Sequence, residues 1–119
     1  MTRPRIEISV ARDFSRTPGA RFIEDGPFSA EVFYNDHVQP AFQRALDTDQ
    51  DLFIDLDGVS AYATSFLQGT FGTLAHDFTT ETVRERMSYK HTDDPILNPL
   101  IERYITEAHR VEKTYAVAA

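Results

Sequence analysis

Three short stretches of the chain have the pattern of β-strands. In residues 5–10 (RIEISV) every second position is isoleucine or valine, which predicts a strand with one buried face. Residues 52–56 (LFIDL) are mostly apolar and lead into the turn-forming pair Asp57-Gly58, as expected for a buried strand that ends there. A third strand is predicted in residues 86–90, with Met87 and Tyr89 facing inward.

Between and after these stretches, apolar side chains recur every three or four positions, which predicts three amphipathic helices. The first follows Ser29, a favourable N-cap residue, and Pro40 within it predicts a kink or a second helical piece. The last begins near Asp94-Pro95, because aspartate suits the cap and proline the first helical position. The three apolar faces comprise Tyr34, Val38, Ala41, Phe42 and Ala45; Leu67, Phe71, Leu74 and Phe78; and Leu97, Ile101, Tyr104, Ala108 and Val111.

The alternation of strand and helix, repeated three times, indicates the α/β fold class, a small sheet with helices packed on it. No repeat or linker divides the 119 residues, so we expect one domain over residues 1–119. Within it, residues 1–27 are expected to form an N-terminal strand and loop, residues 28–115 the core, and residues 116–119 a frayed tail.

Composition narrows the range of functions. The net charge of −7 argues against binding to nucleic acid or to an anionic membrane surface, since both favour basic patches. No apolar run approaches the ~20 residues of a membrane span and no signal peptide opens the chain, which indicates a cytoplasmic protein. There is no cysteine, and the four histidines show no paired spacing, so neither a metal nor another cofactor is expected.

The clearest motif lies at the end of the central strand. The run Asp55-Leu56-Asp57-Gly58-Val59 is followed, after a short gap, by Ala63-Thr64-Ser65-Phe66-Leu67. This arrangement resembles the STAS domain of anti-sigma factor antagonists, in which a strand ends in Asp-Leu-Ser-x-Val and the next helix opens with Asp-Ser-Ser-Gly-Leu. The resemblance implies that Ser65 takes the place of the serine that a partner kinase of the GHKL ATPase type phosphorylates.

The chain as a whole resembles more closely a STAS-like family of unknown function, often small bacterial proteins. Gly-Pro-x-Ser-x-Glu before the first long helix of that family matches residues 26–31, and its Ser-Phe-Leu matches residues 65–67. The resemblance implies a STAS-like fold with a small mixed β-sheet, and a non-enzymatic role in signal transduction through protein–protein interaction. Ala63 replaces an acidic residue of the antagonist motif, and Phe66 replaces a glycine.

Ser65 and its neighbour Thr64 are therefore the candidate phosphoacceptors. A phosphoryl group there would add about −1.5 to −2 charges and three acceptor oxygens at the positive end of a helix. The competing interpretation is that one of the two hydroxyls is an ordinary helix cap.

Two glycines lie on the same helical face as Ser65, opposite the apolar stripe, and each costs roughly 1 kcal/mol of helix stability relative to alanine. Something is expected to approach them closely, either a neighbouring helix of the domain or the surface of a partner. The predicted partner-binding residues are Asp55, Asp57, Gly58, Gly69, Gly72 and His76.

Two other classes of function stay open. The run from Asp55 to Val59 also resembles the first motif of haloacid-dehalogenase-type phosphatases, in which the first aspartate is a nucleophile and the second a general acid beside Mg²⁺. Asp93-Asp94 would then supply the distal metal-binding acids, although half of the chain precedes the motif and Val59 replaces its hydroxylated residue. The third class is a structural subunit that forms a homodimer through the glycine face.

Overall fold

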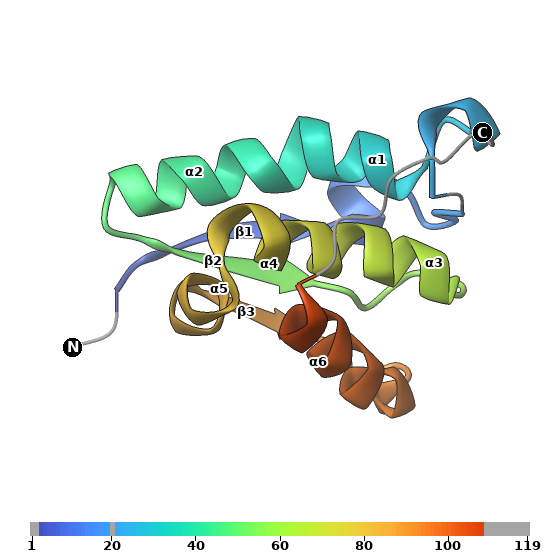
Figure 1. The fold of residues 1–119 in the computed structure, drawn as a ribbon. Helices are drawn as coiled ribbons and strands as arrows, with labels where there is room; N and C mark the ends of the chain where they lie inside the picture. The colour runs from blue at the N-terminus through green and yellow to red at the C-terminus, as the bar shows by residue number, and fades with distance from the viewer. Residues whose placement is uncertain (1–2, 20, 109–119) are drawn as a thin grey trace, which may run out of the picture.

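The computed structural model describes residues 3–19 and 21–108 (Figure 1). The three predicted strands are present as β1 (Arg5–Ser9), β2 (Asp51–Asp55) and β3 (Met87–Lys90). They form one sheet in the order β1-β2-β3, in which Ile54 of β2 lies between Ile8 and Tyr89. The α/β fold class is confirmed. The described strands are all parallel, however, rather than mixed, because each connection contains helices that return the chain to the edge where it started.

Helices fill the connections between the strands. The Thr-Thr-Glu run at residues 79–81 predicts a short turn, and this prediction was wrong: residues 80–86 form a helix, and Thr79 at φ 76° separates it from the helix before. The predicted helical position Val111 and the tail 116–119 lie outside the described residues. In chain order the helical segments are η1 (Val10–Phe14), η2 (Ile23–Asp25), α1 (Ala30–Phe33), η3 (Tyr34–Val38), α2 (Gln39–Asp47), α3 (Thr64–Leu67), η4 (Gln68–Gly72), α4 (Thr73–Phe78), α5 (Thr80–Arg86), η5 (Pro95–Leu97) and α6 (Asn98–Glu107).

The first crossover is helical without interruption from α1 to α2. Ser29 caps it as predicted, since its Oγ accepts a hydrogen bond from the backbone N–H of Val32 at 3.2 Å. The π-helical turn η3 comes shortly before Pro40, which has no N–H to donate to the helix ladder. A second helical piece, α2, therefore begins beside that proline, as the sequence predicted.

The second crossover, from α3 through η4 to α4, buries the predicted stripe. Leu67, Phe71 and Leu74 are fully buried, in one hydrophobic core with residues of the strands and the first crossover. Leu52 and Ile54 point from β2 to this helical side and are also fully buried. The other face of the sheet is more polar: Phe53 is partly exposed there, and the guanidinium of Arg5 lies 4.1 Å from its ring centre.

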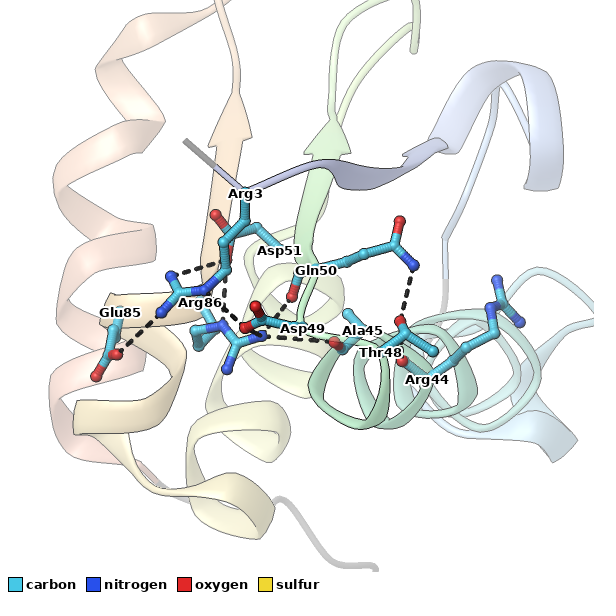
Figure 2. Close-up of polar contacts among 9 residues, drawn as sticks. All are labelled: Arg3, Arg44, Ala45, Thr48, Asp49, Gln50, Asp51, Glu85 and Arg86. Atoms are coloured by element: carbon cyan, nitrogen blue, oxygen red, sulfur yellow. Dashed lines mark hydrogen bonds and ion pairs between the residues drawn. The ribbon is translucent and has the colours of Figure 1, made fainter. Parts of the chain in front are cut away.

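The amino edge of the sheet is held by Arg86, whose side chain is only 14% exposed (Figure 2). Its Nη2 donates to the backbone carbonyl of Gln50 at 2.7 Å, and its Nε donates to Oδ1 of Asp51 at 3.2 Å. Nη1 of Arg3 approaches the same carboxylate oxygen at 3.5 Å. These contacts join the end of α5 to the start of β2, at the edge opposite the candidate site.

Candidate functional site

The predicted site residues from Asp55 to Ser65 lie at the carboxyl edge of the sheet. In a parallel sheet the connections that follow the strands all begin at this edge, which is where α/β proteins commonly bind their ligands. The loop of residues 56–63 leads from β2 to α3, with residues 10–29 after β1 and residues 91–97 after β3 beginning at the same edge (Figure 1).

Asp57 joins the loop after β2 to the segment after β3. Its Oδ1 accepts hydrogen bonds from the backbone N–H groups of Thr92 at 2.7 Å and Asp93 at 2.9 Å, and its Oδ2 accepts one from the Thr92 hydroxyl. In return, the N–H of Gly58 donates to Oδ2 of Asp93 at 2.8 Å. These reciprocal bonds give Asp57 and Gly58 a part in holding the site together.

The Asp57 carboxylate is kept ionised by these bonds. Burial alone would raise its pKa, but the hydrogen bonds from Thr92 and Asp93, together with the Lys90 ammonium 3.7 Å away, outweigh burial and hold the pKa below its usual value. A carboxylate in this state accepts hydrogen bonds at neutral pH and has no proton to give. It does not suit the general-acid role of the phosphatase interpretation.

Asp55 is similarly engaged in local structure. Its Oδ1 accepts a hydrogen bond from the N–H of Asp57 at 3.0 Å, and its Oδ2 lies 4.0 Å from the ammonium of Lys90. Within the described ranges, no group of three or more histidine and carboxylate side chains is placed to hold a metal ion. The phosphatase interpretation therefore gains no support from the arrangement of these acids.

Tyr62, which no sequence pattern singled out, fixes the loop that leads to Ser65. Its hydroxyl donates to the carbonyl of Leu56 at 2.7 Å. Its ring centre lies 5.9 Å from that of Phe66 and 5.3 Å from that of the buried His91, which it meets edge to face. Burial, and then the nearby negative charge of Asp55, raise the pKa of Tyr62, so the phenol keeps the proton that makes this hydrogen bond.

Helix α3 begins at Thr64, one residue before Ser65, as predicted. Thr64 is exposed and Ser65 is partly exposed. The N-cap residue is Ala63, and in the described chain no side chain accepts a hydrogen bond from this end of the helix. The cap interpretation was therefore wrong: both hydroxyls lie inside the first turn, whereas a capping side chain must precede it.

The two glycines of the predicted contact face are buried within the domain. A β-carbon at Gly69 would lie 2.8 Å from the Cβ of Ala30, so the close approach is made by α1. Gly72 is buried as well. Their assignment to a partner-binding surface is corrected accordingly, and the observation that suggested a homodimer is explained by internal packing. His76 is exposed, and its Nδ1 lies 3.1 Å from Oδ1 of Asp77.

Two arginines of the connection between β1 and α1 also contact the segment around Ser65, residues 60–68. The backbone carbonyl of Arg16 accepts hydrogen bonds from both the N–H (3.0 Å) and the Oγ (2.9 Å) of Ser60. Nη2 of Arg21 donates to Oε1 of Gln68 at 2.8 Å. Their basic charge was visible in the sequence, but their position beside the Ser65 segment depends on the fold.

The fold and site define a small α/β domain with its functional candidates at one edge of a parallel sheet. Residues 29–97 match the family described as a STAS-like domain of unknown function, and this match spans more than half of the chain. The protein therefore belongs to that STAS-like family, which fits a non-catalytic module. The chain matches no curated protein and no solved structure. Among the described residues, none of the helices has the length and apolar character required to cross a membrane.

Proposed function

We propose that this domain is a non-enzymatic signalling module, similar in role to an anti-sigma factor antagonist, whose binding to a protein partner is switched by phosphorylation of Ser65. Membership of a STAS-like family supports a module of this kind. The observation that carries the proposal is the start of α3. Thr64 is exposed and Ser65 partly exposed in a helical turn that has no side-chain cap, after a loop fixed by Tyr62.

The proposed partner is a kinase of the GHKL ATPase type. The hydroxyl oxygen of Ser65 attacks the γ-phosphorus of ATP, the bond to ADP breaks, and the hydroxyl proton passes to a base of the kinase. The phosphoserine brings about −1.5 to −2 charges to the surface. The positive helix end stabilises part of this charge, and the remainder repels acidic groups of a bound partner. Thr64 is the alternative acceptor.

The proposed docking surface surrounds Ser65 at the carboxyl edge. Asp55 and Gly58 are accessible there, and Asp57 holds the loop between them and the neighbouring segment. His76 is exposed eleven residues after Ser65, roughly 16 Å along the same helical run, and is a separate contact point, because Gly69 and Gly72 between them are buried.

The test combines phosphorylation with binding. The purified domain is incubated with ATP and a GHKL-type ATPase encoded beside its gene, and mass spectrometry locates the phosphoryl group, which is expected on Ser65. Ser65→Asp is expected to change partner affinity roughly 5- to 150-fold, the effect of about 1–3 kcal/mol from a charge placed in an interface. Ser65→Ala should bind like the wild type but remain unmodified.

Ser88→Ala is the matched control, because Ser88 is an exposed serine on β3, outside this surface. It should be modified and bind as the wild type does. Equal partner affinity for Ser65→Asp and Ser65→Ala would contradict the switch.

A further inference from the structure

We propose that phosphorylated Ser65 is received within its own domain by the guanidinium of Arg21, with Arg16 beside the loop that leads to Ser65. This inference rests on the proposed phosphorylation of Ser65 and assigns it a receiving site. Phosphorylation would then join the connection between β1 and α1 to the start of α3. Phosphorylation would therefore change the structure of the domain as well as its charge.

The first observation is the shortage of partners for these two arginines. Most basic side chains in the described chain have a carboxylate within ion-pair distance, as Arg12 has Asp13 at 2.9 Å and Arg84 has Glu102 at 2.6 Å. Among the described arginines and lysines, those without one are Arg16, Arg21 and Arg44. Two of these three lie beside the Ser65 segment, on a protein whose net charge is −7.

The second observation is the course of the Arg21 side chain. It crosses the helix at Gly69, where its Cγ would lie 3.8 Å from an added β-carbon, and its Nη2 donates to Oε1 of Gln68 at 2.8 Å. Ser65 lies three and four residues before Gln68 and Gly69, so the three positions are neighbours on one helical face. Long helical side chains lean toward the N-terminus of their helix, which is the direction in which Ser65 lies from Gln68.

The third observation is an unmet hydrogen-bond donor. Nε of Arg21 is buried and has no hydrogen-bond partner among the described residues. A buried donor without an acceptor is unfavourable, and a phosphoryl oxygen is a strong acceptor. Arginine binds phosphate through parallel N–H bonds, so Nε and one Nη can act together. In the unmodified domain the neutral amide of Gln68 occupies one of these donors, and a charged phosphate would compete with it.

Arg16 contacts the loop that leads to Ser65. Its backbone is bonded to Ser60, in the loop that leads to α3, and its side chain is exposed. The connection that carries both arginines also carries Ile23 and Phe28, which are 55% and 44% exposed. Fixing this connection against α3 would therefore also fix two apolar side chains that a partner can contact.

The test places phosphoserine at position 65 during translation, so that it needs no kinase. A ³¹P NMR titration then gives the second pKa of the phosphoserine, which is ordinarily about 6. We expect it to be about one unit lower in the otherwise wild-type domain than in the Arg21→Gln variant, because an opposite charge in contact favours the dianion. Phosphoserine should also raise the melting temperature, and Arg21→Gln should remove that increase.

Arg44→Gln is the matched control, since Arg44 is exposed on α2, and it should leave both readings unchanged. Arg21→Met, which keeps the aliphatic stem over Gly69, replaces the glutamine variant if that variant does not fold. An identical second pKa with and without Arg21 would overturn the receiving site but leave the partner switch standing. Failure of every kinase to modify Ser65 would count against the switch and leave this result intact.

Discussion

Replacing Arg86 by methionine removes a guanidinium from the amino edge of the sheet and keeps most of its aliphatic stem (Figure 2). The side chain is only 14% exposed, so water replaces the guanidinium poorly in the native state. Its bond to the carbonyl of Gln50, at 2.7 Å, is the shortest contact, and it ties the turn between α2 and β2 to α5. The variant leaves that carbonyl without this donor.

The expected loss follows from these contacts. A hydrogen bond to a charged group contributes about 1.5–3 kcal/mol, which applies to the bond with Gln50. The contact with Asp51 is worth less, about 0.5–1 kcal/mol, because Arg3 remains beside that carboxylate at 3.5 Å. The approach to the Ala45 carbonyl, at 3.5 Å, is too long to add much. Arg86→Met should therefore lower the free energy of unfolding by about 2–4 kcal/mol, or the melting temperature by about 8–16 °C.

Urea unfolding followed by circular dichroism measures this loss as a lower midpoint with an unchanged slope. Arg44→Met is the control, since Arg44 is exposed on α2 in the same region, and it should change stability by no more than about 0.5 kcal/mol. The stability of Arg86→Lys should fall between those of Arg86→Met and Arg44→Met, because an ammonium keeps the charge and loses the planar geometry of the guanidinium. If Arg86→Met and Arg44→Met unfold at the same urea concentration, the bonds of Arg86 do not stabilise the fold as argued.

The elements with a strong local pattern could be predicted from the sequence. The stripe of Leu67, Phe71 and Leu74 is fully buried, because periodic apolar positions need only a sheet to pack against. Helix α5 was not predicted, because its apolar pattern is weak. Val83 is its only buried residue, and the helix follows Thr79, whose positive φ no sequence pattern predicted.

The candidate site, too, could be predicted only in part from the sequence. The start of α3 near Ser65 followed from a local motif, but the contacts that surround it join residues far apart in the chain. Asp57 bonds to Thr92 across 35 residues, and Arg21 bonds to Gln68 across 47. The glycine at position 69 did signal a close approach. Only the fold identifies its neighbour as Ala30, inside the domain, because no residue near Gly69 in sequence encodes that contact.

Two further predictions concern packing and charge at the site. Gly69→Ala should lower stability by about 1–3 kcal/mol, since the new β-carbon would clash with Ala30, and thermal melts should find the double variant with Ala30→Gly more stable than Gly69→Ala alone. The second concerns acid. The pKa of Asp57 is lower in the folded domain than the value of about 3.9 expected in the unfolded chain. Its ionised form therefore stabilises the fold fully above that pH, and this contribution is lost as the pH falls through the folded-state pKa. Asp57→Asn lacks the charge that Thr92 and Asp93 bind, so it should be clearly less stable than the wild type at pH 7. The unfolding free energies of the wild type and of Asp57→Asn, measured from pH 7 to pH 3, should approach each other as the pH falls. A difference that stays constant over this range would show that the charge of Asp57 does not stabilise the site.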